Sequence, residues 1–275
     1  MDEYLAINRA NWDERVPAHV ASPDYAVASF AADPGFLSGV VRFDLPRLPD
    51  LKGLAGVHLQ CHIGTDTVSL GRLGARMTGL DFSEPAIEAA RRIAEAAGVE
   101  ADFHVGDLYD APDVLGRACF DFVYTGIGAL IWLPDIRGWA NVVASLLRPG
   151  GELFIREGHP MLWTLEDERE DGLLVVKYPY FEQPGPTVID VEGTYVQTEQ
   201  VFEKTVSHEW NHALSEIIGG LLDENMELTL FEEHDSIPWN GIPGQMEEIG
   251  GGEWRIIDRP ERVPASYTLR ARLRG

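Results

Sequence analysis

Two aspartates and one glycine have the spacing of a site that holds a polar ligand. Asp81 and Asp107 each end or follow a short apolar segment, and Gly64 lies in a turn that precedes them. A carboxylate at the end of a strand can accept hydrogen bonds from both hydroxyls of a ribose, and a glycine lets the main chain approach a ligand closely. Ser83 is a better helix cap than Asp81, whereas Asp107 could instead cap a helix that begins at Leu108. A dinucleotide fingerprint requires three glycines, so an NAD site is not favoured.

Three histidines are candidates for a general base. His159 follows the fifth predicted strand, and the ordinary pKa of histidine, about 6.5, suits proton removal at neutral pH. His208 and His212 begin a predicted helix that would pack over the same opening. Each of the three could instead be a structural histidine.

The segment His208-Glu209-Trp210-Asn211-His212 also matches the H-E-x-x-H pattern of zinc proteases. The pattern falls at the start of the predicted helix instead of inside it, and a zinc site would leave the first half of the chain unexplained. We therefore expect no metal and keep a zinc hydrolase as an alternative only.

Short apolar strands alternate with helical stretches between residues 53 and 157. The predicted strands are 57–61, 75–80, 101–105, 120–125 and 152–156. The predicted helices are 65–73, 84–97, 107–115 and 135–147. This alternation is typical of a parallel sheet covered by helices on both faces, whose ligands lie beyond the carboxyl ends of the strands. The candidate ligand-binding residues are therefore expected at one edge of the sheet.

The flanking segments have other patterns and give a division into four parts. These are an N-terminal helical lid over 1–50, the core over 51–158, an inserted β-element over 159–209 and a closing part over 210–275. The β-element is predicted from strand-like runs such as 173–181 and 187–206. The closing part begins with a helix over about 210–222. Strands follow near 226–234 and 267–273, joined by a connection at 236–264 without a helix, so we expect an antiparallel end to the sheet.

The composition excludes several classes of partner. Lys and Arg total 22 against 45 Asp and Glu, and the formal charge of −23 repels a phosphate backbone and an anionic membrane surface. We expect neither nucleic acid nor membrane as a partner, and a soluble, cytoplasmic protein. The acidic surface is either a solvated face or a rim that attracts a cationic substrate. Cys61 and Cys119 are the only cysteines and are expected to be free thiols.

The order of these features resembles the class I S-adenosylmethionine-dependent methyltransferases over about residues 50–158. The ordered set comprises the turn at Gly64, Asp81, Asp107, the segment 120–126 and Leu147-Arg148-Pro149-Gly150-Gly151. A bacterial subgroup that acts on small molecules is similar at Leu59-Gln60-Cys61-His62, Trp132-Leu133-Pro134-Asp135, Glu157-Gly158-His159-Pro160 and Glu209-Trp210-Asn211-His212. The resemblance implies an α/β, Rossmann-like three-layer sandwich with a seven-stranded, mostly parallel sheet.

The resemblance also implies S-adenosyl-L-methionine as cofactor and assigns residues to it. Gly64 would lie against the methionine part, Asp81 would hold the ribose, and Asp107 with Leu108 would contact the adenine. The remaining expected cofactor residues are Gln60, His62, Phe82, Thr125, Gly126 and Trp12, the last as one of several aromatic rings, with Tyr4, Tyr25 and Trp132, that could face the sulfonium. The chain departs from the family at Gln60, where an acidic residue is usual, and at His62 and Thr65, where glycines are usual.

The function that the resemblance implies is methyl transfer to an oxygen or nitrogen atom of a small-molecule metabolite. A protein that binds the same cofactor and catalyses a non-methylating reaction would have the same motifs and is the alternative. The sequence does not identify the acceptor, the general base or the oligomeric state.

Overall fold

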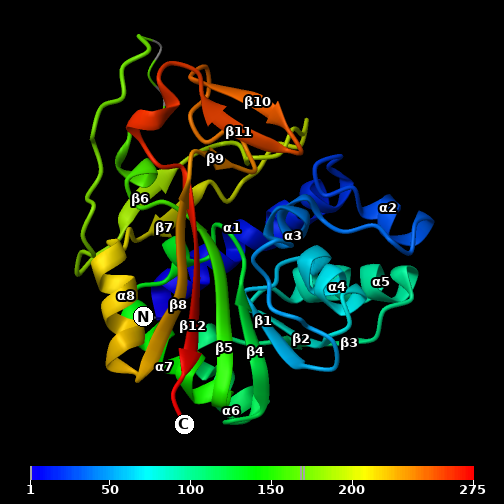
Figure 1. Ribbon diagram of the computed structural model, residues 1–275. Helices are drawn as coiled ribbons and strands as arrows, with labels where there is room; N and C mark the ends of the chain where they lie inside the picture. Colours follow the sequence, from blue (N-terminus) through cyan, green and yellow to red (C-terminus); the bar gives the residue numbers. More distant parts are fainter. Residues whose placement is uncertain (1, 168, 170) are drawn as a thin grey trace.

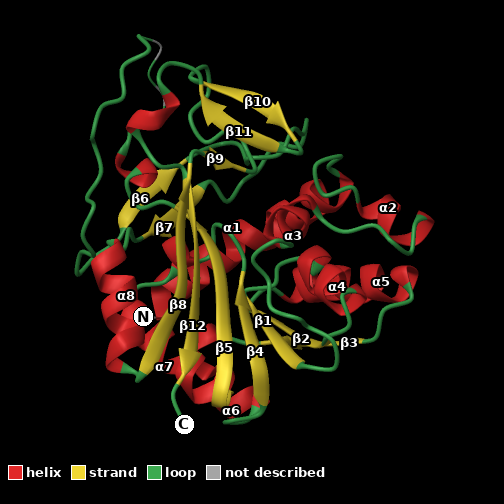
Figure 2. Cartoon of the chain, in the orientation of Figure 1, coloured by secondary structure: helices red, strands yellow, loops and turns green. Residues whose placement is uncertain are grey.

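A seven-stranded sheet forms the centre of the computed structural model (Figures 1 and 2). The structure describes residues 2–167, 169 and 171–275. The strands are β1 (Ala55–Leu59), β2 (Arg76–Asp81), β3 (Ala101–Val105), β4 (Phe120–Thr125), β5 (Leu147–Gly158), β8 (Met226–His234) and β12 (Ser266–Leu273). Their order is β3-β2-β1-β4-β5-β12-β8. Only β12 runs antiparallel to its neighbours β5 and β8. The predicted mostly parallel sheet and its antiparallel end are confirmed.

Helices cover both faces of this sheet, which gives the predicted three layers. The helices are α4 (Thr65–Arg72), α5 (Glu84–Ala97), α6 (Ala111–Leu115), α7 (Ile136–Leu146) and α8 (Leu214–Asp223). Because side chains alternate along a strand, Val123 of β4 packs into the cluster around Trp139 of α7, while Phe122 and Tyr124 pack into a second cluster with Leu70 of α4. All five side chains are fully buried, so the sheet is anchored from both sides.

The N-terminal segment forms α1 (Asp2–Ala21), α2 (Val27–Ala32) and α3 (Gly39–Asp44). Helix α1 crosses the carboxyl ends of the sheet strands and is bonded to a hairpin of β6 (Thr187–Asp190) and β7 (Val206–Glu209). The predicted strand character of 173–181 is wrong, because this segment forms only an isolated bridge between Leu165 and Val176.

Two further predictions differ from the structure. The helix predicted from 210 begins only at Leu214, because Glu216 accepts a hydrogen bond from the N–H of Ala213 (2.7 Å) and so caps the helix there. The connection at 236–264 was predicted to be a loop without a helix. It contains a three-stranded sheet of β9 (Ser236–Ile237), β10 (Met246–Gly250) and β11 (Glu253–Ile256), which closes over a small apolar cluster that includes Leu162.

The cysteines and the membrane criterion can also be compared with the sequence. Cys61 follows β1 and is buried, Cys119 precedes β4 and is exposed, and both are free thiols as predicted. Within the described ranges, no helix has the length and apolar character needed to cross a membrane.

Polar side chains of α1 attach the inserted segment to the core. Asn8 forms two bonds of 2.8 Å with the backbone of His208, one to its carbonyl and one from its N–H. Arg15 is buried and donates to the carbonyls of Asn11 (2.8 Å), Lys204 (2.8 Å) and Gly193 (3.0 Å). The lid and the insertion therefore form one cap.

We expect Arg15→Ala to lower the free energy of unfolding by about 1–3 kcal/mol, because the buried carbonyl of Asn11 and the partly buried bonds to Lys204 and Gly193 lose a charged donor. Proteolysis within 187–206 should become faster. Urea unfolding and limited proteolysis measure both effects. Arg92→Ala is the control, because Arg92 is 68% exposed and forms only a surface pair with Glu88, worth less than about 0.5 kcal/mol. An equal loss of unfolding free energy in the two variants would show that the bonds of Arg15 do not hold the lid to the insertion.

Candidate functional site

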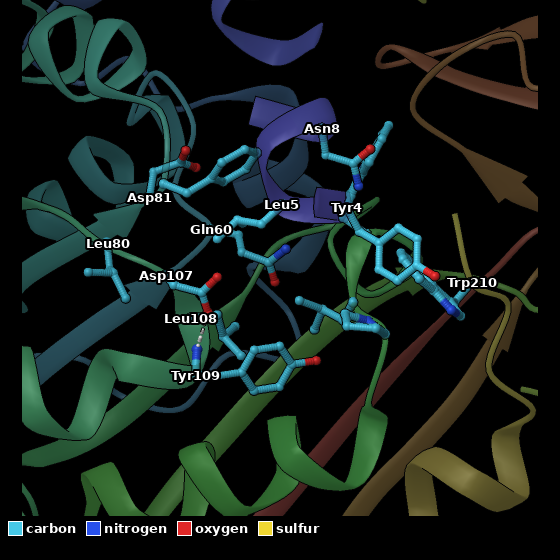
Figure 3. A pocket seen from close by; sticks show the side chains of 15 residues that line it. Tyr4, Leu5, Asn8, Gln60, Leu80, Asp81, Asp107, Leu108, Tyr109 and Trp210 are labelled. Atoms are coloured by element: carbon cyan, nitrogen blue, oxygen red, sulfur yellow. Dashed lines mark hydrogen bonds between the residues drawn. The ribbon is translucent and has the colours of Figure 1, made fainter. Parts of the chain in front are cut away.

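A cavity of about 610 Å³, partly open to solvent, lies at the carboxyl ends of the parallel strands (Figure 3). Residues from the strand ends and the following loops form its floor and sides: Gln60, Leu80, Asp81, Phe82, Gly106, Asp107, Leu108, Tyr109, Trp132, Leu133 and Pro134. Tyr4, Leu5 and Asn8 of α1 close it on one side, together with Trp210. The two aspartates predicted to share one ligand line the same cavity.

Asp81 is the last residue of β2 and is nearly buried. Its Oδ2 accepts from the N–H of His62 (2.8 Å) and its Oδ1 from the N–H of Ser83 (2.9 Å). Burial raises the pKa of Asp81 to about 6, and the backbone hydrogen bonds oppose that shift. Ser83 caps α5, as predicted, by accepting from the N–H of Ala86. A carboxylate oxygen accepts more than one hydrogen bond, so Asp81 can still accept from a ligand hydroxyl.

Asp107 combines the two roles between which the sequence could not choose. It caps the short 3-10 helix η1 (Leu108–Asp110) because its Oδ1 accepts from the N–H of Tyr109 (2.7 Å, dashed in Figure 3). The same side chain lines the cavity beside Leu108. Burial raises the pKa of Asp107 above its usual range.

The turn between β1 and α4 has left-handed backbone at three alternating positions. The φ angles are 55° at Gln60, 49° at His62 and 76° at Gly64. These are positions that favour glycine. Thr65, where the resemblance also implies a replaced glycine, is the first residue of α4. The Nε2 of Gln60 donates to the carbonyl of Ala129 (3.0 Å). Its buried Oε1 has no partner among the described residues.

Five predicted cofactor residues lie near this turn but do not line the cavity: His62, Gly64, Thr125, Gly126 and Trp12. Trp12 packs edge-on against His62, and Nε2 of His62 lies 2.7 Å from Nδ1 of His19. A Cβ at Gly64 would lie 2.7 Å from the Cβ of Ala90, so this glycine lets α4 approach α5.

Thr125 and Gly126 lie at the end of β4. Thr125 is fully buried, and its Oγ1 has no partner in the described part of the chain. A Cβ at Gly126 would lie 3.2 Å from Nε2 of His58, so only glycine leaves this position uncrowded. Both residues lie beside the strand end from which the loop carrying Trp132 leaves the sheet.

The three candidate histidines have different surroundings. In His159, Nδ1 accepts from the N–H of Met161 (3.0 Å) and Nε2 lies 3.1 Å from Oε1 of Glu233, so both ring nitrogens have protein partners. In His212, Nε2 donates to the carbonyl of Leu133 (2.9 Å) and Nδ1 lies 2.8 Å from Oε2 of Glu182.

His208 differs from the other two because neither of its ring nitrogens has a hydrogen-bond partner among the described residues. Nδ1 of His212 makes no well-aligned hydrogen bond either, but it lies within 2.8 Å of Glu182. The ring of His208 packs edge-on against Tyr4, with 5.1 Å between ring centroids, and Tyr4 lines the cavity. Its buried Nδ1 has no partner among the described residues.

The H-E-x-x-H segment does not have the helical geometry of a zinc site. His208 and Glu209 end strand β7, and His212 precedes α8. Zinc proteases place the two imidazoles on one face of a helix. In this chain strand geometry sends His208 and Glu209 to opposite sides, and the ring of His212 bonds to the loop after β4.

Sequence reasoning missed several lining residues. Leu5 and Asn8 come from α1, Tyr109 follows Asp107, and Trp210 was considered only as part of the zinc pattern and of the family resemblance. Tyr109 was adjacent to a predicted contact and could have been included. Asn8 could not, because its place depends on how α1 docks against the hairpin.

A second, smaller hollow of about 210 Å³ lies on the other side of Trp210. Leu130 and Ile131 face this hollow, whereas Trp132 and Leu133 face the first cavity. The loop after β4 therefore separates the two spaces.

Comparison with known proteins connects this geometry to a family. Residues 57–151 match the model of a family described as a methyltransferase domain. A ubiquinone biosynthesis O-methyltransferase of Xanthomonas euvesicatoria is 34% identical over 107 residues, covering 38% of this chain and 44% of the relative. One of Xanthomonas oryzae is 29% identical over 162 residues, covering 56% and 59%. The chain thus spans about half the length of these relatives.

Solved structures agree over more of the chain. An S-adenosylmethionine-dependent methyltransferase of Mesorhizobium loti has a TM-score of 0.59 with 21% identity, covering 86% of this chain and 98% of the other. The crystal structure described as a putative methyltransferase of the same kind from Listeria monocytogenes has a TM-score of 0.61 with 15% identity, covering 86% and 99%. At these identities the likeness establishes the fold.

We expect His159→Ala to lower the free energy of unfolding by about 1–3 kcal/mol and to leave the turnover of the folded protein near that of the wild type. The reason is that both ring nitrogens already bond to protein groups. Chemical denaturation and turnover measured on the same preparation separate the two effects. A large fall in turnover at unchanged stability would instead identify His159, the first of the three candidates from the sequence, as the base.

Proposed function

We propose that the chain belongs to the class I S-adenosylmethionine-dependent methyltransferase family, because residues 57–151 match a methyltransferase-domain model and the fold matches solved structures of that kind. We propose further that it transfers a methyl group from S-adenosylmethionine to an oxygen or nitrogen atom of a small molecule. The observation that carries the proposal is that Asp81, Asp107 and Gln60 line one cavity at the carboxyl ends of the strands. This arrangement matches the chemistry of an adenosine with two ribose hydroxyls and a planar base.

The lining residues fit the parts of this cofactor. Asp81 offers acceptor oxygens to the ribose hydroxyls, and Asp107 offers one to the amino group of the adenine. Leu80 and Leu108 provide apolar surface, and Tyr109 provides an aromatic ring near the adenine position. The unpartnered Oε1 of Gln60 can accept from a donor group at the methionine end. A buried acceptor without a partner is costly, which supports a ligand at this point.

The cofactor supplies an electrophilic methyl group on a sulfonium sulfur. The work of the protein is then to hold the acceptor atom in line with the methyl–sulfur bond at about 3 Å and to exclude water. Trp132 and Tyr4 line the cavity, and their rings can face a positive charge. The cap formed by α1 and the hairpin limits access of solvent.

We further propose that His208 removes the proton when the acceptor is protonated. Its Nδ1 is unpartnered, and its ring touches Tyr4 at the cavity wall. His159 and His212 have both ring nitrogens within bonding distance of protein groups. The relatives named ubiquinone biosynthesis O-methyltransferases favour an oxygen acceptor. A cofactor-binding protein with a non-methylating reaction remains the alternative.

The overall proposal is tested by calorimetry with S-adenosylhomocysteine, followed by a mass-spectrometric screen of candidate acceptors with S-adenosylmethionine. Binding together with a mass increase of one methyl group on an acceptor supports methyl transfer. Binding with conversion but without this increase would favour the alternative. Absence of binding at millimolar concentration would reject both.

Asp81→Asn should weaken binding of S-adenosylhomocysteine about tenfold to a thousandfold, because charge-assisted bonds to the ribose are lost. Asp110→Asn is the control, since Asp110 is exposed near the cavity and does not line it. Titration calorimetry and thermal unfolding of each variant give affinity and fold. Unchanged affinity would remove Asp81 from the site.

The pH dependence of binding gives an independent prediction. The pKa of Asp81 is about 6, and only the ionised carboxylate accepts from both hydroxyls, so affinity should rise between pH 5 and pH 7 and stay level above. Binding at pH 6 should release protons, measured by calorimetry in two buffers of different ionisation enthalpy. Dependence that remains in Asp81→Asn comes from other buried carboxyls: Asp107, whose pKa burial also raises, and Glu157, whose pKa burial raises to about 7.

His208→Ala should lower turnover about a hundredfold or more while the affinity for S-adenosylhomocysteine stays within about twofold. The bonds between Asn8 and the backbone of residue 208 do not need the imidazole, so the cap should stay in place. His104→Ala, at an exposed position of β3, is the control. Turnover close to the wild type would exclude His208 as the base.

A further inference from the structure

The carboxyl group of Glu157, the penultimate residue of β5, accepts hydrogen bonds from several backbone N–H groups. The side chain is 2% exposed and accepts four hydrogen bonds. Its Oε1 accepts from the N–H groups of Gly128 (2.6 Å) and Gly158 (2.6 Å), and its Oε2 from those of Ala129 (2.8 Å) and Leu130 (2.8 Å). No ion pair to Glu157 occurs among residues 2–167, 169 and 171–275. Backbone amides alone therefore bond to this buried carboxyl. Burial raises the pKa of Glu157 to about 7, while the four backbone hydrogen bonds favour the ionised form, so the carboxylate is mostly charged above that pH.

Three of these donors are consecutive residues of the loop that follows β4, and the same loop is held from other sides. The carbonyl of Ala129 accepts from Nε2 of Gln60 (3.0 Å). The carbonyl of Ile131 accepts from the N–H of Trp210 (2.8 Å), and His212 bonds to the carbonyl of Leu133. The polar groups of 128–133 are thus bonded to the turn after β1, to the segment between β7 and α8 and, through Glu157, to β5.

The position of this loop determines the shape of the cavity. Trp132, Leu133 and Pro134 line the cavity, and Gln60 is oriented by its bond to Ala129. Glu157 itself does not line the cavity and lies at the second hollow with Leu130 and Ile131. Any effect of Glu157 on ligand binding must therefore pass through the loop.

We propose that Glu157 is a positioning residue that fixes the loop 128–133 in its ligand-binding conformation, and through Ala129 orients Gln60 toward the cofactor. The inference rests on the proposed function, because it assigns the cavity to the cofactor. Charged acceptors make stronger hydrogen bonds to N–H groups than neutral ones do, and one carboxylate can satisfy four donors. A neutral amide cannot, because its NH₂ group would face N–H donors.

The test compares Glu157→Gln and Glu157→Asp with the wild type. Calorimetry gives the affinity for S-adenosylhomocysteine, and hydrogen exchange detected by mass spectrometry follows the backbone amides of 128–130 and of α5. The glutamine variant should lose about tenfold or more in affinity, and its loop amides should exchange at least tenfold faster. The aspartate variant keeps the charge on a shorter side chain, so it should lie between the glutamine variant and the wild type in both measurements.

Glu227→Gln is the matched control, since it makes the same chemical change on β8 at a side chain that is 59% exposed and forms a long surface pair with Arg274. Its loop exchange and affinity should equal those of the wild type. The inference is overturned if Glu157→Gln binds within twofold of the wild type, or if α5 exchanges faster to the same extent as the loop, which would indicate general destabilisation.

The two proposals fail in different ways. If the wild type does not bind S-adenosylhomocysteine, the proposed function fails, while exchange of the loop amides still reports whether Glu157 holds them. If the wild type binds and both Glu157 variants bind equally well, the proposed function stands and the positioning role is rejected.

Discussion

Hydrogen bonds from backbone N–H groups to carboxylates, placed just where strands end, shape the whole site. Asp81 at the end of β2, Asp107 after β3 and Glu157 near the end of β5 each accept from N–H groups of a connecting segment. The parallel strands bring these three side chains to one edge of the sheet. A segment that leaves a strand at this edge has backbone N–H groups without partners in the sheet. A carboxylate on or next to a neighbouring strand accepts from them at low entropic cost, because the strand already fixes its position. The fold and the ligand site therefore depend on the same contacts.

The turn at residues 60–64 shows how such a contact supports strain. Left-handed backbone costs a residue with a Cβ roughly 1–2 kcal/mol, and both Gln60 and His62 adopt it. The N–H of His62 donates to Asp81, and the N–H of Cys61 donates to the carbonyl of Leu80 (2.9 Å), so β2 holds the turn on two sides. In return the chain places the amide of Gln60 in the cavity, which a glycine could not do. Strain that neighbouring elements hold in place is typical of functional sites.

The sequence predicted the central sheet because each strand and helix there has its own local signal. The Ser83 cap and the glycine that ends α5 define that helix without reference to the rest of the chain. The sheet at 236–264 has no such signal, because its strands are short and pair around a cluster that includes the distant Leu162. The strand predicted at 173–181 failed for the converse reason: its residues have strand propensity, but the segment forms only the isolated bridge at Val176.

The candidate site divides in the same way. Asp81, Asp107 and Gln60 were identified because strand ends of a parallel sheet converge whatever covers them. The roles of His159, His208 and His212 depended on tertiary partners. Glu233 comes from a distant strand, and His208 is oriented by Asn8 at the other end of the chain. The positions of histidines in the sequence do not show which ring nitrogens will have hydrogen-bond partners in the fold. Those partners are the basis on which we compare the three histidines as candidate bases.

The cap is tied to the floor of the site through the loop 128–133. Asn8 bonds to the backbone of His208, while Trp210 and His212, a few residues further along, bond to carbonyls of that loop. Glu157 holds the same loop to the sheet. A series of hydrogen bonds, most of them from a side chain to the backbone, therefore links α1, the hairpin and β5. A movement of the cap that admits a ligand must break some of these bonds or carry the loop with it. Since Gln60 also bonds to Ala129, the cap and a cavity side chain are attached to the same loop.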